Sequence, residues 1–138
     1  MTRAEIFEFL RGHRLAVISS VGPAASPQAA LIGVAVTEAL DIIFDTLSTS
    51  RKYANLRADP RVALVVGWDA EQTMQIEGIA EVISGDALTA CKQDYFRAFP
   101  DGREREHWPD IAYIRVRPQW LRYSDFSQTP PRIEELTL

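Results

Sequence analysis

Short apolar segments with the two-residue periodicity of β-strands recur along this chain of 138 residues, and they do not alternate regularly with helices. That order argues against a doubly wound parallel sheet, in which strands and helices take turns. Six or seven strands with three helices at their ends instead predict a small, mostly antiparallel barrel. The predicted strands cover residues 14–20, 28–36, 41–46, 61–68, 72–83, 112–117 and 119–124, and the predicted helices cover 2–10, 48–58 and 85–99.

Two of these strands carry more specific information about the barrel. Gly78 lies in the middle of segment 72–83, and a glycine inside a long strand is typical of a bulge or bend. Segment 61–68 is apolar on both faces, which predicts burial on both sides. A small barrel has little interior room for so many apolar side chains, so the pattern also favours a dimer.

The end of the chain differs from the rest because prolines interrupt it. Pro130 and Pro131 follow Phe126 closely, and we expect an arm or a partly disordered tail there. The predicted organisation is therefore one domain over residues 1–126 and a C-terminal tail over residues 127–138.

Composition argues against several classes of function. The chain has 15 Lys and Arg residues against 19 Asp and Glu residues, which does not suit a nucleic-acid-binding surface. No apolar run approaches the roughly 20 residues of a membrane helix, and no signal-peptide core is present. Cys91 is the only cysteine, so we expect neither an intrachain disulfide nor a cysteine-rich metal site. His13 and His107 lie far apart in the sequence, so we expect no metal site from them either. These features predict a cytoplasmic protein.

A cluster of hydroxyls and cations marks the most distinctive local site. Thr46 and Ser50 follow an apolar strand, and Arg51 and Lys52 stand where a helix should begin. Cations are unfavourable at a helix start unless an anion lies among them, because the free N–H groups there are already positive. Hydroxyls, N–H groups and two cations together suit a phosphate. The simpler alternative is an N-cap at Ser48 or Thr49 with both cations in solvent.

With this segment in view, the chain resembles the pyridoxamine-phosphate-oxidase-like, FMN-binding split-barrel superfamily over about residues 15–124. The most specific element is the Ser-Arg-Lys helix start at 50–52, followed about eight residues later by Asp-Pro-Arg-Val at 59–62. The other matching segments are Leu-Ala-Val-Ile-Ser-Ser from residue 15, Met-Gln-Ile-Glu-Gly-Ile-Ala-Glu-Val from residue 74, and Tyr-Ile-Arg-Val-Arg-Pro-Gln-Trp-Leu-Arg-Tyr-Ser-Asp from residue 113.

The resemblance implies a mainly β fold of the α+β class, a split β-barrel with flanking helices. It also implies a homodimer with FMN at each end of the subunit interface. By position, the FMN phosphate would be held by Arg51, Lys52, Ser50 and Thr46. The backbone of Ala30, Leu31, Ile32 and Gly33 would lie along the isoalloxazine ring. Thr73 and Gln75 would reach the flavin from the partner subunit or the floor of the site, and Trp120 and Arg122 would lie near the ring edge or the dimer seam.

Two departures from the oxidases limit what the resemblance implies about activity. The oxidases have a basic residue on the second strand, near Ala29, where this chain has Gln28, Ala29 and Ala30. They also have a C-terminal Arg-x-His pair for the pyridoxal substrate, which this chain lacks. Since a flavin performs its own electron transfer, no catalytic side chain is required and none is assigned. The prediction is a flavin-dependent oxidoreductase that acts on a small organic molecule, without pyridoxamine oxidation being carried over.

Three alternatives remain open. One is a reductase of the same fold that uses a deazaflavin, whose longer anionic tail could meet Arg115 and Arg117. Another is a non-catalytic protein that binds flavin or haem. Haem would need an axial ligand, which only His13 and His107 could supply. The third is a dimeric protein without a cofactor that binds a partner through the same cleft.

Overall fold

Eight strands form one curled antiparallel sheet in the order β2-β1-β5-β6-β7-β4-β3, with β8 added to β7. The computed structural model describes all 138 residues. The strands are β1 Leu15–Val21, β2 Pro27–Gly33, β3 Ala35–Val36, β4 Ile42–Leu47, β5 Arg61–Val66, β6 Gln72–Val82, β7 Ile111–Asp125 and β8 Arg132–Thr137. The helices are α1 Arg3–Arg11, α2 Arg51–Ala58 and α3 Gly85–Ala98, with short 3-10 turns at Pro23–Ala25, Asp69–Glu71 and Pro100–Arg105.

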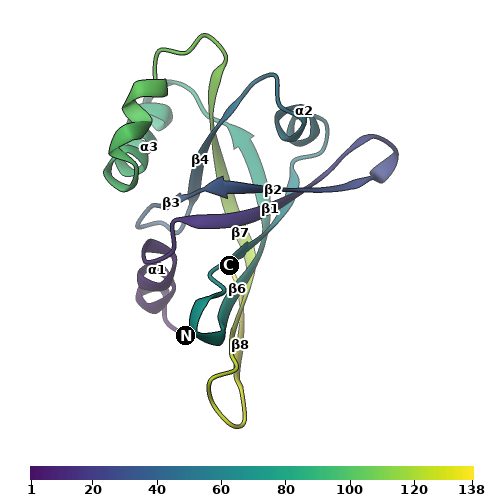
Figure 1. Cartoon of the computed structure of the whole chain (residues 1–138), viewed down its shortest axis with the longest axis vertical. Helices are drawn as coiled ribbons and strands as arrows, with labels where there is room; N and C mark the ends of the chain where they lie inside the picture. The colour runs from purple at the N-terminus through teal and green to yellow at the C-terminus, as the bar shows by residue number, and fades with distance from the viewer.

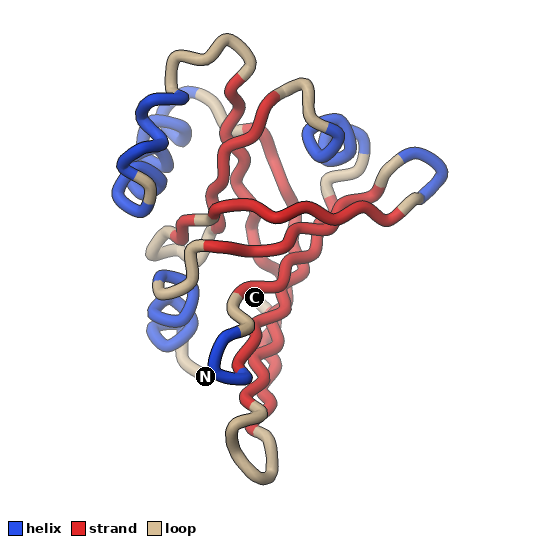
Figure 2. Tube along the Cα trace, in the orientation of Figure 1, coloured by secondary structure: helices blue, strands red, loops and turns tan.

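The helices surround the body of the sheet, and a ribbon of β6, β7 and β8 extends away from it (Figure 1). Figure 2 shows that this ribbon ends in the turn between β7 and β8. The predicted split barrel with flanking helices is confirmed, with one strand more than the six or seven expected. None of the helices is both long and apolar enough to cross a membrane.

Local signals account for where the helices begin and end. Thr2 and Glu5 form a reciprocal capping box at the start of α1, as their spacing indicates. Ser50 caps α2 by accepting a hydrogen bond from the backbone N–H of Tyr53, so the cap is neither Ser48 nor Thr49. Ser84 precedes α3, but its side chain makes no capping hydrogen bond.

Two apolar clusters form the core. The larger one holds 20 buried residues from the sheet, α1 and α2, including Phe44, Leu64 and Met74. The smaller one lies beneath α3 and includes Cys91 and Tyr95. Burial raises the pKa of the Cys91 thiol, which suits a packed residue rather than a nucleophile.

The bulge predicted at Gly78 is present and explains the longest strand. Gly78 pairs with Pro118 and Glu77 pairs with Trp120, so Gln119 is left without a partner in the ladder. A Cβ atom on Gly78 would lie 2.5 Å from the carbonyl oxygen of Arg117, which leaves room only for glycine. Because the bulge accommodates Pro118, the two strands predicted around this proline are one strand of 15 residues.

Burial of β5 on both sides was a wrong prediction for the single chain. Val62, Leu64 and Val66 are buried, whereas Ala63 and Val65 are exposed on the opposite face. The core and the helices cover one face of this part of the sheet and leave the other open. That open surface, called here the outer face, comprises Val17, Ser19, Ala29, Leu31, Ala63, Val65, Gln75, Glu77, Trp120 and Arg122.

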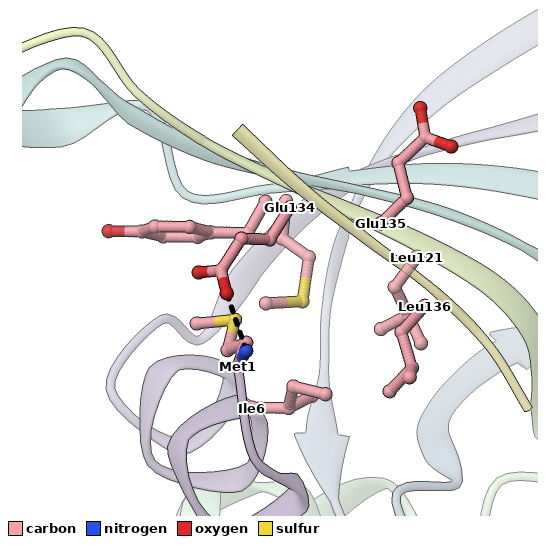
Figure 3. A pocket seen from close by; sticks show the side chains of 8 residues that line it. Met1, Ile6, Leu121, Glu134, Glu135 and Leu136 are labelled. Carbon is pink, nitrogen blue, oxygen red and sulfur yellow. Dashed lines mark hydrogen bonds and ion pairs between the residues drawn. The ribbon is translucent and has the colours of Figure 1, made fainter. Parts of the chain in front are cut away.

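The C-terminal segment is more ordered than its prolines suggested. Residues 132–137 form β8, which pairs with β7, and Leu136 packs against the larger core cluster. Leu136, Ile6 and Leu121 lie around a cavity (Figure 3), which has a volume of about 340 Å³. The Met1 amine forms an ion pair with Glu134 beside this cavity, at a distance of 2.6 Å. Disorder is therefore wrong for residues 132–137, while the domain boundary at residue 126 stays a prediction.

Candidate cofactor site

The end of β4 and the start of α2 bring the predicted hydroxyls and cations together. The hydroxyl oxygens of Thr46 and Ser50 lie 3.0 Å apart, and Lys52 Nζ lies 3.5 Å from Thr46 Oγ1. Thr46 is 8% exposed, so its hydroxyl lies at the floor of the group. The sequence places these residues together because the strand runs directly into the helix through one tight turn.

A cavity of about 260 Å³ opens beside this group, between α2 and the edge strand β2. We call it the α2 cavity, and it is lined by Ile18, Ser20, Gln28, Ala29, Ala30, Arg51 and Lys52. Ala29 and Ala30 have small side chains, so a ligand in the α2 cavity can approach the backbone of β2 closely.

Charge in the α2 cavity is positive and unbalanced. None of the ten ion pairs of the chain includes Arg51 or Lys52. Asp45 precedes Thr46 on β4, but its carboxylate is bound by Arg105, whose Nε lies 2.9 Å from it. Two free cations beside hydroxyl donors fit the chemistry of a phosphate group.

A polar network holds Arg51 at the rim of the α2 cavity. Arg51 Nε donates to Gln28 Oε1 at 3.0 Å, and Asn55 Nδ2 donates to the same oxygen at 2.9 Å. Asn55 Nδ2 also lies 3.0 Å from Ser20 Oγ. Sequence reasoning missed Ser20 and Asn55, although Asn55 follows Arg51 by one helical turn and so shares its face of α2.

The predicted ring-binding strand has two different surfaces. Ala30 lines the α2 cavity, whereas Leu31 is 62% exposed on the outer face. Ile32 is buried in the core, and Gly33 lies against Phe99, because a Cβ there would be 2.9 Å from the Phe99 ring. Since β2 is an edge strand, its backbone is unpaired on the side away from β1.

Three predicted residues lie away from the α2 cavity within one chain. Gln75 and Trp120 line a separate cavity of about 170 Å³ on the outer face. Thr73 precedes Gln75 by two positions on the same strand and therefore shares that face. The α2 cavity instead opens beside Ile18, whose side chain points into the core, so the two groups of residues lie on opposite faces of the sheet.

The arginines near the end of the chain all have acidic partners. Arg115 Nε lies 2.7 Å from Glu81, and Arg117 shares the same carboxylate at 3.5 Å. Arg122 pairs with Glu135 at 3.1 Å. These cations are therefore less available to an anionic ligand than Arg51 and Lys52.

The curled antiparallel sheet, its flanking helices and a cationic cavity beside an edge strand define a protein of the split-barrel class. A sequence model of the pyridoxamine 5'-phosphate oxidase family matches residues 2–125, and the chain belongs to this family. The chain is 30% identical over 122 residues to a pyridoxine/pyridoxamine 5'-phosphate oxidase from Bordetella avium (strain 197N). That match covers 83% of this chain but only 56% of the relative's length.

Solved structures show the same fold at low sequence identity. A heme binding protein from Mycobacterium smegmatis matches with a TM-score of 0.84 at 17% identity, over 99% of this chain and 58% of that one. The heme storage protein HutZ from Vibrio cholerae matches with a TM-score of 0.70 at 15% identity, over 83% of this chain and 88% of that one. At these identities the likeness concerns the fold alone.

Proposed function

We propose that this protein binds FMN and is a flavin-dependent oxidoreductase acting on a small organic molecule, with the cytoplasm as the expected location. The observation that carries the proposal is the α2 cavity, where Arg51 and Lys52 have no acidic partner in a chain of the pyridoxamine 5'-phosphate oxidase family. FMN ends in a phosphate monoester, which carries about two negative charges near neutral pH. Two cations balance that charge.

The chain's own residues would bind and orient the cofactor. Arg51 and Lys52 would hold the phosphate, with Ser50 and Thr46 as hydroxyl donors. The edge backbone of β2 from Ala30 to Gly33 would support the ring. A bound flavin supplies the electron transfer itself, so the chain need only position it and the substrate. We assign no general acid or base.

We further propose that the protein is a homodimer joined through the outer face. This surface exposes Leu31 and Val65, which an isolated chain leaves in water. It also carries Thr73, Gln75 and Trp120, which lie on the face of the sheet opposite to the α2 cavity of their own chain. A second copy packed on this face would present these residues to its partner's cofactor.

The other cofactors have weaker support in this chain. Haem is suggested by the names of two structural neighbours, but neither His13 nor His107 lines the α2 cavity. The ring of His13 packs on Phe9, and its Nδ1 lies 2.7 Å from the Phe9 carbonyl oxygen. A deazaflavin tail would need Arg115 and Arg117, which are paired with Glu81.

Titration of the purified protein with FMN, followed by quenching of flavin fluorescence, tests the proposal. We expect saturable binding by the natural chain and weaker binding by Arg51→Ala and by Lys52→Ala. Loss of a charged hydrogen bond or two should raise the Kd roughly 10-fold or more in each variant. Arg57→Ala is the control, because Arg57 is an exposed cation at the far end of the same helix. Equal FMN affinity in all three variants and the natural chain would rule out the phosphate assignment.

A further inference from the structure

We infer that Gln28 is a positioning residue that holds the Arg51 guanidinium ready for a phosphate. The inference rests on the proposed FMN site and adds a specific residue to it. Gln28 does not need to touch the ligand, because its effect passes through Arg51.

The hydrogen-bond chemistry fixes the orientation of the Gln28 amide. Its neighbours on α2 are Arg51 Nε at 3.0 Å and Asn55 Nδ2 at 2.9 Å, and both groups can only donate. The amide oxygen must therefore face α2, since the amide nitrogen could accept from neither. Asn55 is 6% exposed and also bonds Ser20, so the acceptor is tied to the core of the protein.

Gly22 shows that the fold makes room for this amide. A Cβ on Gly22 would lie 2.5 Å from Gln28 Nε2 and 2.9 Å from Gln28 Cδ. The backbone of Gly22 has φ −87° and ψ −174°, which any residue can adopt. The missing side chain at Gly22 therefore leaves space for the Gln28 amide, and a methyl group there would push the flexible end of Gln28 aside.

The consequence for Arg51 is a guanidinium that is oriented before the ligand arrives. Its Nε–H is bound to Gln28, while no other hydrogen bond or ion pair occupies its two terminal nitrogens. Arg51 is otherwise exposed, and an exposed arginine samples many rotamers that binding would have to restrict. Pre-orientation reduces that entropic cost of binding. A neutral glutamine does this without adding positive charge that a phosphate dianion does not require.

The test compares FMN with riboflavin, which has the same ring and no phosphate. We expect Gln28→Ala to raise the Kd for FMN about 10-fold, because the charged contact between Arg51 and the FMN phosphate becomes weaker. The Kd for riboflavin should stay unchanged, because riboflavin has no phosphate. In an Arg51→Ala background, Gln28→Ala should have no further effect on FMN. Gly22→Ala should reproduce the Gln28→Ala pattern, and Gln93→Ala, an exposed glutamine of α3, should change neither Kd.

Two results with these variants would overturn the inference. An equal loss of affinity for FMN and riboflavin in Gln28→Ala would show a general structural role. Additive losses in the Gln28→Ala/Arg51→Ala double variant would show that Gln28 acts independently of Arg51.

A cofactor-free measurement separates this inference from the proposed function. In the NMR spectrum of the protein without flavin, the Arg51 Nε–H signal should be protected from exchange with water and lose that protection in Gln28→Ala. If the natural chain binds no FMN, the proposed function fails, and this signal still decides whether Gln28 positions Arg51. An unchanged Nε–H signal in Gln28→Ala would contradict the positioning role.

Discussion

At the scale of residues, the candidate site is marked by two adjacent cations that have no acidic partner and line one cavity. Asp45, Glu81 and Glu135 each hold an arginine elsewhere in the chain, whereas Arg51 and Lys52 have only neutral partners. Arg3, Arg14, Arg57 and Arg103 also lack acidic partners, but none of them lines the α2 cavity, where Arg51 and Lys52 lie next to each other. An anion that neutralises them should bind there in preference to other surfaces.

A second residue-scale feature is the carboxyl group of Asp41, which should make stability depend on pH. Burial raises the pKa of Asp41, although Arg115 and Arg117 oppose the shift. The folded chain holds this proton more tightly than the unfolded chain does. As the pH rises from the pKa of Asp41 in the unfolded chain to its higher pKa in the folded chain, Asp41 therefore destabilises the fold increasingly. Asp41→Asn should therefore raise the Tm at pH 7 and leave it unchanged well below pH 4. Thermal melts at both pH values, with Asp110→Asn as an exposed control, measure this effect, and an equal gain at both would contradict the burial explanation.

At the scale of elements, the bulge between β6 and β7 shapes the sheet. Gly78→Ala places a Cβ against the carbonyl oxygen of Arg117, so it should lower the free energy of unfolding by roughly 1–3 kcal/mol. Gly12→Ala is the matched control, because a Cβ there meets only ordinary contacts of 3.4 Å and 3.5 Å. Urea denaturation compares the two variants, and equal stabilities would show that the bulge tolerates a side chain.

The last strand is the second element with a measurable contribution. Leu136 extends from β8 onto the core, so Leu136→Ala should lower the free energy of unfolding by roughly 1–2 kcal/mol, less than for a fully buried leucine. Leu138→Ala removes the same atoms from an exposed position and should be close to neutral. Equal effects of the two substitutions in urea denaturation would mean that β8 adds no stability.

The elements also show which parts of the fold can be predicted from sequence. Thr2 with Glu5 and Asp59-Pro60 mark helix ends correctly because these signals act within a few residues. Continuity of β7 through Pro118 depends on Gly78, 40 positions earlier, and β8 depends on pairing with β7. Such partners are distant along the chain, so local patterns contain no information about them.

At the scale of the whole molecule, the outer face should be the dimer interface. Leu31, Val17, Val65 and Gln75 form one row across four strands of this face. Val65→Arg places a charge in the middle of that row, so we expect a monomer in sedimentation velocity and weaker FMN binding. Thr89→Arg adds the same charge to the exposed side of α3 and should leave a dimer. A Val65→Arg protein that sediments as the natural chain does would place the interface elsewhere.

The candidate site could be predicted only in part for the same reason. The predicted phosphate-binding residues are close together in the sequence, so local patterns can reveal them. They are Thr46, Ser50, Arg51 and Lys52. Gln28, Ser20 and Asn55 come from β2, β1 and α2 and meet only after the sheet has formed. In the proposed dimer, the placement of Thr73, Gln75 and Trp120 relative to a cofactor would depend on a second copy of the chain.

Native mass spectrometry of the protein mixed with FMN shows whether the protein is a flavin-binding dimer, since one spectrum reports both subunit number and cofactor. We predict a species of two 15.5-kDa chains carrying two FMN molecules. Haem offered in the same experiment should not displace the flavin. Single chains without FMN, or dimers that take up haem and no FMN, would contradict the proposed FMN-binding dimer.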